Sequence, residues 1–238
     1  MLVSARIDPH THSTCSDGTD TPTELMAAAA RAGLDVVGLT DHDTTAGWTE
    51  AAAAVAATGV TLLRGTEISC AADGAVLHLL AYLFDPEDAA LRDVLEHARA
   101  SRDGRARRMV ERLAADYPIT WQDVVEQASR EATIGRPHIA DALVSAGCFP
   151  DRSAAFAGPL ATDSPYYAPH WAPDPVEACG LVRGAGGVPE DLDLPAVALN
   201  PNDGAHKGGL AAARGTEQAG DGAGRQVQIQ AMEDLLAP

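Results

Sequence analysis

The chain of 238 residues has few aromatic and few basic side chains: aromatics make up 4 % of it, and Lys207 is its single lysine. Acidic residues outnumber basic ones by 34 to 17, which gives a formal net charge of −17. Such a surface disfavours stable binding to duplex nucleic acid or to an anionic membrane, because both partners attract clustered positive charge. No run of about 18 apolar residues is present, so we expect no membrane-spanning helix.

The sequence also lacks paired cysteine motifs and an export signal. Its four cysteines (Cys15, Cys70, Cys148 and Cys179) are widely spaced, with no Cys-x-x-Cys pair. This spacing predicts reduced thiols rather than a disulfide framework or a zinc knuckle. The first residues do not combine a basic segment with an apolar one, so we expect no signal peptide and a cytoplasmic protein.

Three common catalytic or nucleotide-binding motifs are absent as well. The chain contains no Gly-x-Ser-x-Gly elbow, no Walker loop and no Gly-x-Gly-x-x-Gly loop. These absences disfavour a serine hydrolase of the α/β-hydrolase type and the usual phosphate-cradling loops.

The first 95 residues alternate short apolar runs with helical runs. Thr21 and Glu24 have the spacing of a capping box, and Gly33 follows the predicted helix as a C-terminal stop. We predict strands at residues 2–7, 35–40, 60–69 and 75–84, with helices at 22–32 and 46–57. Alternating strands and helices with short loops predict parallel β/α units, and strands rich in Val and Leu fit a sheet covered by helices.

The rest of the chain divides into a helical segment and an unusual tail. Residues 96–170 predict helices at 97–117, 121–132 and 135–147, which we interpret as an insertion. Residues 171–189 begin like a further helix and strand, so the predicted β/α body comprises 1–95 and 171–189. From residue 190 to 238 the sequence is rich in glycine and holds no aromatic residue. Such a segment buries too little apolar surface to offset its ordering entropy, which predicts disorder, with a weak helix near its end.

Polar residues with metal-ligand chemistry follow the first two predicted strands. His10 and His12 lie two residues apart, so in an extended chain their imidazoles point to the same side and can meet at one ion. Pro9 predicts a strand end or a bulge here. Two surface histidines are the alternative. Asp17 on its own would be interpreted as a turn residue. It becomes a candidate ligand because it follows His10 and His12 at the distance of a short loop. His42 lies between two aspartates, a set that favours a cation, although a helix N-cap at Asp43 or Thr44 is the alternative.

The next two predicted strands carry one such residue each. Glu67 follows the third strand, and its two oxygens could bridge two metal ions. His78 lies within an apolar run, where a core histidine is the alternative. Ligands on four successive strands nevertheless match the β/α barrels, whose sites lie at the carboxyl ends of the strands. A set of His, Asp and Glu without Cys suits Zn, Mn or Fe, and such a cluster can supply hydroxide at neutral pH and neutralise a phosphoryl group.

A second cluster lies at a predicted helix start. Arg136 and His138 flank Pro137, which suits the first turn of a helix, and the combination is a candidate phosphate site. A solvated charge is an equal alternative. The Arg-rich run at 99–112 is expected to be a solvated face, paired with Glu96 and Glu111, and a weaker idea is that it steers an anionic substrate.

The motifs together resemble the PHP (polymerase and histidinol phosphatase) family. They are Asp-Pro-His-Thr-His-Ser-Thr-Cys-Ser-Asp-Gly at 8–18, Thr-Asp-His-Asp at 40–43, Gly-Thr-Glu-Ile-Ser at 65–69, His78, and Gly-Arg-Pro-His at 135–138. Within the family the likeness is to stand-alone metal-dependent phosphoesterases, the group with the 3′,5′-nucleoside bisphosphate phosphatases that also degrade oligonucleotides from the 5′ end.

The resemblance implies a distorted seven-stranded β/α barrel with a site for two or three divalent metal ions. Manganese is favoured, with zinc, iron or magnesium as alternatives. It implies that His10, His12 and Glu67 hold one ion, Glu67 and His78 contribute to a second, and Asp17 and His42 contribute to a third. Arg136 and His138 would face the substrate phosphate, and His42, Glu67 and Arg136 are the predicted catalytic residues. The expected partner is a nucleotide or a short oligonucleotide.

Two departures from the family pattern bear on this expectation. Pro9 stands where the family usually has leucine, which is a minor change. After residue 189 the family continues with an Ala-His-Pro strand end and a late Ser-Asp-x-His-Gly motif, and neither occurs here; His206 is a poor replacement. The expected fold is therefore an incomplete barrel, whose open sheet edge could mediate self-association.

Three functions follow as hypotheses. The first is a metal-dependent phosphoesterase that hydrolyses phosphate monoesters or diesters. The second is a truncated, catalytically impaired remnant that binds metal without turnover. The third is a histidinol-phosphatase-like hydrolase, against which the insertion after His78 argues.

Overall fold

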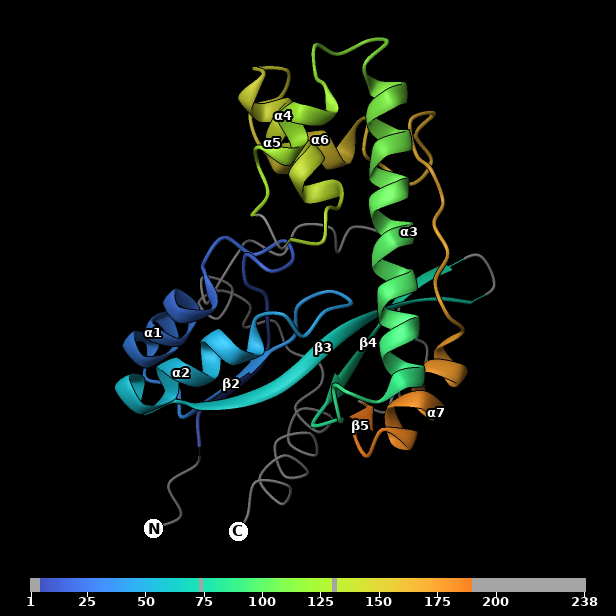
Figure 1. The fold of residues 1–238 in the computed structure, drawn as a ribbon. Helices are drawn as coiled ribbons and strands as arrows, with labels where there is room; N and C mark the ends of the chain where they lie inside the picture. Colours follow the sequence, from blue (N-terminus) through green and yellow to red (C-terminus); the bar gives the residue numbers. More distant parts are fainter. Residues whose placement is uncertain (1–4, 73–74, 130–131, 190–238) are drawn as a thin grey trace, which may run out of the picture.

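The computed structural model describes residues 5–72, 75–129 and 132–189. The tail at 190–238, with His206 and the predicted terminal helix, lies outside the described residues. The described residues form one mixed sheet in the order β1-β2-β3-β4-β5 and a layer of helices beyond one end of it (Figure 1). The strands are β1 (Ile7–Thr11), β2 (Val36–Leu39), β3 (Thr61–Ala72), β4 (Ala75–Tyr82) and β5 (Val188–Pro189).

The first half of the sheet is parallel, as predicted. β1 pairs with β2, and β2 pairs with β3. Helix α1 (Pro22–Ala32) connects β1 to β2, and helix α2 (Trp48–Thr58) connects β2 to β3. The predicted capping box is present: the Thr21 side chain accepts from the Glu24 N–H, and the Glu24 side chain accepts from the Thr21 N–H. Gly33 ends α1 at φ 72°, a conformation that favours glycine.

The prediction for the first strand is wrong in its position. Residues 2–4 of the predicted strand 2–7 lie outside the described residues, residues 5 and 6 are not in a strand, and the strand is Ile7–Thr11, so His10 lies inside it and not after it. The register shifts between Asp8 and Thr11, which confirms the irregularity predicted at Pro9. The two strands approach closely at this irregularity. A Cβ on Gly38 would lie 2.0 Å from the Pro9 carbonyl oxygen, so the position requires glycine.

The second half of the sheet differs from the predicted parallel β/α units. β3 and β4 are antiparallel, and β4 also pairs antiparallel with β5. Too few residues separate β3 from β4 for a crossover, since a parallel connection needs a dozen or more. β3 runs on to Ala72, so Glu67 and His78 lie inside strands and not at strand ends.

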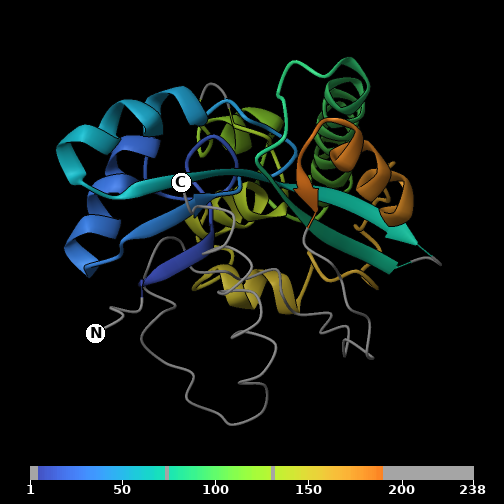
Figure 2. The same ribbon diagram turned by 90° about the horizontal axis from the view of Figure 1, so that it is seen from below.

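The two largest of the three apolar clusters among the described residues hold the molecule together. In the first, α1 and α2 cover the parallel strands, and α7 (Pro175–Gly184) and the start of α3 (Ala89–Leu113) pack on the antiparallel part (Figure 2). The second core joins the end of α3 to α4 (Trp121–Val125), α5 (Arg136–Ser145) and α6 (Arg152–Ala157). α4 is shorter than the helix predicted at 121–132.

Three further predictions concern the barrel, the cysteines and membrane-spanning helices. The barrel of seven strands stays a prediction, since the described residues contribute five strands. No disulfide joins the four cysteines, all of which lie in the described ranges. Among the described helices, none is both long enough and apolar enough to cross a membrane.

Candidate metal centre

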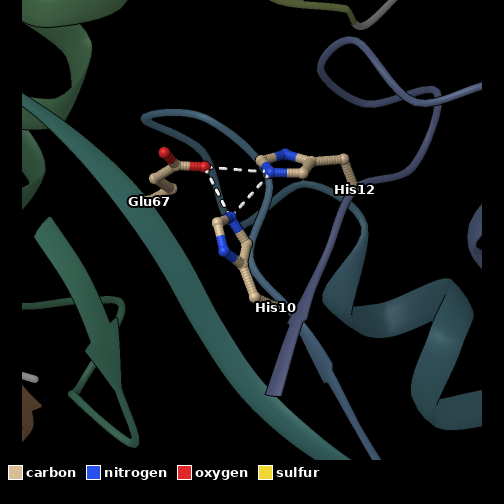
Figure 3. Close-up of side chains that lie close together, drawn as sticks. All are labelled: His10, His12 and Glu67. Carbon is tan, nitrogen blue, oxygen red and sulfur yellow. Dashed lines mark hydrogen bonds and ion pairs between the residues drawn. The ribbon is translucent and has the colours of Figure 1, made fainter. Parts of the chain in front are cut away.

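His10 of β1, His12 directly after that strand and a carboxylate of β3 meet at one point of the sheet (Figure 3). Nε2 of His10 lies 3.0 Å from Nε2 of His12, and each lies 2.9 Å from Oε2 of Glu67. The three atoms thus form a triangle with sides near 3 Å. Ligand atoms with this spacing can share an ion at bond lengths of about 2.0–2.2 Å.

Glu67 also faces two further histidines. Its second oxygen, Oε1, lies 3.0 Å from Nδ1 of His78 on β4. Nδ1 of His42 lies 3.7 Å from Oε2 of Glu67. The two oxygens of one carboxylate are therefore shared between different groups of imidazoles. The Glu67 side chain is only 8 % exposed, so water does little to stabilise its charge.

Asp17 completes the cluster from the loop after β1. Its Oδ1 lies 3.6 Å from Nδ1 of His12, and its Oδ2 lies 3.5 Å from Nε2 of His42. Three overlapping groups could each hold an ion: His10, His12 and Glu67; His12, Asp17 and His42; and His42, Glu67 and His78. The six residues that the sequence marked as candidate ligands thus lie together, and His12, His42 and Glu67 each belong to two groups.

The loop that carries Asp17 is fixed by Asp41. The Asp41 carboxylate accepts hydrogen bonds from the N–H and hydroxyl of Ser13 and from the hydroxyl of Ser16. Gly18 permits the tight turn, because a Cβ there would lie 2.3 Å from the His12 carbonyl oxygen. Asp41 is therefore a positioning residue.

Asp43 anchors the opposite side of the cluster. Its carboxylate accepts from the N–H and hydroxyl of Ser69 at 2.7 Å each, and its φ of 53° turns the backbone back after His42. The alternative of an N-cap at Asp43 or Thr44 is wrong, because Gly47 is the N-cap of α2.

Arg102 of α3 reaches into the same network, although the Arg-rich run was expected to be solvated. Its side chain is 7 % exposed, and its Nε lies 3.4 Å from Oδ2 of Asp43. Nη2 donates to the Ser69 hydroxyl at 2.5 Å and lies 3.3 Å from Nδ1 of His42. Sequence reasoning noted Asp43 beside His42 but did not predict roles for Arg102 and Ser69 in the site.

Burial and charge set the protonation of the cluster. Although burial opposes ionisation, the charge of His42 and hydrogen bonds from His10 and His12 hold the pKa of Glu67 well below its ordinary value. The pKa of Asp17 is likewise lowered, against its burial, by His42 and His12. Burial and then the Arg102 charge lower the pKa of His42. Both carboxylates are therefore ionised, the form in which they bind metal.

His12 behaves differently. Burial alone would lower its pKa, but the hydrogen bond to Glu67 and the charges of Asp17 and Glu67 raise the pKa to about 9. His12 consequently carries a proton at neutral pH until a cation replaces it.

The second predicted cluster lies at the start of α5. Nδ1 of His138 accepts from the Gly135 N–H at 3.1 Å, and the imidazole is 4 % exposed. The Arg136 guanidinium donates to the Leu160 carbonyl at 3.2 Å and lies over the ring of Phe156, 5.3 Å from its centroid. Burial lowers the pKa of both side chains, so His138 is neutral. Neither residue is a solvated surface charge.

Comparison with known proteins decides the family. The model of the PHP domain family matches residues 8–141, which is more than half of the chain. The chain belongs to the PHP family. The resemblance stated from the motifs is thereby confirmed.

Two similar relatives act on nucleotides or RNA according to their names. This PHP chain is 37 % identical over 191 residues to the 3′,5′-nucleoside bisphosphate phosphatase of Chromobacterium violaceum, covering 77 % of the chain and 65 % of that protein. It is 34 % identical to a 5′-3′ exoribonuclease of Haemophilus influenzae, covering 78 % and 68 %. The chain thus spans about two thirds of the length of these relatives.

Solved structures agree with the fold. A protein of Bifidobacterium adolescentis assigned as a metal-dependent phosphoesterase superposes with a TM-score of 0.76 at 45 % identity, covering 79 % of this chain and 66 % of its own. A C. violaceum structure described as an amidohydrolase with bound sulfate and no metal gives a TM-score of 0.72 at 37 % identity, covering 78 % and 66 %. The description of the B. adolescentis neighbour and the His, Asp and Glu cluster of this chain both suggest divalent metal ions.

Proposed function

We propose that this PHP chain hydrolyses phosphate esters of nucleotides or short oligonucleotides in a reaction that needs two or three divalent metal ions. The observation that carries the proposal is the shared carboxylate of Glu67, whose two oxygens face different histidines of overlapping ligand groups. The names of the relatives support the substrate class.

The donor set fits such ions. Neutral imidazoles and ionised carboxylates without cysteine suit manganese, iron or zinc in a catalytic site, and we expect manganese. His10, His12 and Glu67 would hold one ion, His78 would join Glu67 at a second, and Asp17 and His42 would serve a third. When bound, the ions would lower the pKa of a water molecule and neutralise charge on the phosphoryl group.

Residues of the chain would perform the remaining tasks. Glu67 and His42 would fix the positions of the ligand groups relative to one another, since each of the two residues belongs to two groups. Arg136 would bind phosphate oxygens, because a planar guanidinium can donate two parallel hydrogen bonds to a phosphate. His138 accepts a backbone N–H at Nδ1, which places its proton at Nε2, where it could donate to the same phosphate.

Metal counting and an assay on one sample test the proposal. The chain would be purified with Mn²⁺, its metal measured by mass spectrometry, and its turnover measured on adenosine 3′,5′-bisphosphate, a short 5′-phosphorylated oligonucleotide and histidinol phosphate. We expect at least about two ions per chain and turnover of the first two substrates.

Two variants sharpen the test. His42→Ala should lose turnover, whereas His97→Ala should keep it, because His97 lies on α3 against Trp171 with ring centroids 3.9 Å apart and touches no candidate ligand group. Metal without turnover would favour the non-catalytic remnant, and turnover of histidinol phosphate alone would favour the third hypothesis. Absence of both metal and turnover would overturn the proposal.

A further inference from the structure

The helical layer has a hollow near the end of α3 that lies away from the sheet (Figure 1). The hollow has a volume of about 440 Å³, and its walls come from the turn after α3, the turn after α5 and the segment after α6. It lies apart from the candidate metal centre. From Arg102, which touches that centre, to Leu113 at its end, α3 extends roughly 16 Å at a rise of about 1.5 Å per residue.

Three aromatic side chains line this hollow, which are Tyr117, Phe149 and Tyr166. The ring centroid of Tyr117 lies 5.7 Å from that of Phe149 and 5.8 Å from that of Tyr166. The two outer rings are inclined by 41° and 71° to the Tyr117 ring, so the three do not form one flat stack. The face of an aromatic ring carries partial negative charge, and rings at different angles around one space attract a cation.

Carboxylates add full negative charge to the same place. Asp163 is the acidic residue of the lining, and it takes part in none of the ion pairs between described residues. Asp116, next to Tyr117 in the chain, accepts a hydrogen bond from the Tyr166 hydroxyl at 2.7 Å. This bond, together with the Asp116 charge, raises the pKa of Tyr166 to about 12. The phenol therefore stays neutral, and the negative charge remains on the carboxylates.

The protein supplies no matching positive charge from the described residues that line the hollow, since none of them is a lysine, an arginine or a histidine. The nearest arginines in the chain have other partners: Arg112 donates to the Tyr167 carbonyl oxygen, and Arg152 pairs with Asp141. Aromatic walls with an acidic side chain favour a cation from solution. They favour one with an apolar surface, because a strongly hydrated metal ion gains little from contact with rings.

We propose that this hollow binds a small organic cation with an alkylated ammonium group, held against Tyr117, Phe149 and Tyr166 with Asp163 as its counter-charge. Aromatic rings are the usual recognition elements for quaternary ammonium groups. The volume of about 440 Å³ lies within the range of small-molecule sites, about 300–1,000 Å³. The lining shares no residue with the candidate ligand groups, so the proposal goes beyond the phosphoesterase activity and does not depend on it.

Choline and its uncharged isostere 3,3-dimethylbutan-1-ol test this site. The two molecules have nearly the same shape, but only choline carries a positive charge. Calorimetric titrations would measure the affinity of both for the full chain, in one sample loaded with Mn²⁺ and in one treated with a chelator. Choline should bind at least about fivefold more tightly than the alcohol, because the rings and the carboxylate favour the charge. Mn²⁺ should leave that ratio unchanged.

Two substitutions, each with a matched control, locate the bound cation. Phe149→Leu removes a ring of the hollow, and Trp121→Leu removes a ring elsewhere in the helical layer. Asp163→Asn removes the charge of the lining, and Glu111→Gln removes an exposed charge of α3 outside the hollow. Phe149→Leu and Asp163→Asn should each weaken choline binding by about threefold, whereas both controls should keep the wild-type affinity.

The outcomes decide the proposal separately from the phosphoesterase activity. Urea unfolding would show that each variant keeps its fold, and Asp163→Asn stays informative if Phe149→Leu does not fold, because Asp163 is exposed. The proposal would be overturned by choline binding no more tightly than the alcohol, or by wild-type choline affinity in either folded variant. Choline binding that disappears with Mn²⁺ would place the cation at the metal centre and would also contradict it.

Discussion

The sheet and the helical layer carry opposite charges into the centre of the molecule. Strands β1 to β4 and their loops supply imidazoles and ionised carboxylates, the groups that bind cations. Helices α3 and α5 supply guanidiniums, the groups that bind anions. Under the proposed function a phosphorylated substrate would need both, because metal ions on the sheet and arginines on the helices would neutralise its phosphates from two sides. The sheet would thus bind the cations, and the helices would bind the anion.

One helix connects the two regions physically. The first half of α3 packs Leu91 and Leu95 into the core under the sheet, and its second half packs Met109 and Leu113 into the helical core. The buried arginines lie between these halves. Because one rigid helix spans both cores, it fixes the position of the guanidiniums relative to the sheet-borne ligands.

The strongest way to break this comparison is to neutralise the shared carboxylate on the sheet side. Glu67→Gln should reduce bound metal and lower any turnover by more than about 100-fold, since even residues outside the direct ligand set typically cost 10–100-fold. Metal content and kcat/KM would be measured together. Glu50→Gln is the control, because Glu50 lies on α2 and accepts only from Thr23 among the contacts seen. Full metal content in Glu67→Gln would contradict the shared-carboxylate interpretation.

The helix side can be tested through Arg102. Arg102→Met should lower the free energy of unfolding by about 3–5 kcal/mol, because it leaves the buried Asp43 carboxylate without its cation. Arg107→Met should change it by less than about 0.5 kcal/mol, as is usual for exposed positions. Urea denaturation monitored by circular dichroism measures both. Equal stability of the two variants would show that Arg102 does not anchor the sheet to α3.

Acidity should tune the sheet side through His12. Its pKa of about 9 in the metal-free chain means that a cation must displace a proton below that pH. Affinity for Mn²⁺ should therefore rise by up to about tenfold per pH unit between pH 6.5 and 9 and then level off. Calorimetry at several pH values gives the slope. In His12→Gln this steepness should diminish, and an unchanged slope would assign the proton to another group.

The smallest expected effect concerns two matching helix caps, one in each region. Thr21 caps α1 beside the sheet, and Thr120 caps α4 in the helical layer, each within a capping box. Thr21→Ala and Thr120→Ala should each cost about 1 kcal/mol of stability and leave metal content unchanged. Thermal and urea unfolding would measure the cost. A loss of metal in either variant would mean that the caps position the ligands directly.

The two regions also differ in how far the sequence predicts them. The ligands on the sheet were predictable, because their residue types recur on successive strands. The expectation that all these ligands lie at the carboxyl ends of parallel strands was only partly correct. Glu67 pairs with Leu80 across an antiparallel ladder, so His78 is the diagonal neighbour of Glu67 on the same face of the sheet. The short link between β3 and β4 was the signal for that geometry.

The arginines of α3 were predicted to be exposed to solvent because they are charged, and this was wrong for Arg102 and Arg105. Their spacing was the better guide. Leu91, Leu95 and Ala98, then Met109 and Leu113, mark a buried stripe at intervals of three and four residues, and Arg102 and Arg105 continue it. A guanidinium at a position of the apolar stripe indicates a buried partner or ligand. Which partner it meets depends on β3 and the loop after β2, and one sequence does not specify that packing.

The most direct measurement of the central claim is anomalous X-ray scattering at the manganese edge, from crystals of the chain grown with Mn²⁺. At least about two peaks should lie among Glu67 and the four surrounding histidines, with Glu67 between them. Peaks elsewhere on the molecule, or none at Glu67 while the protein retains its fold, would show that the strands gather these side chains for a purpose other than holding metal.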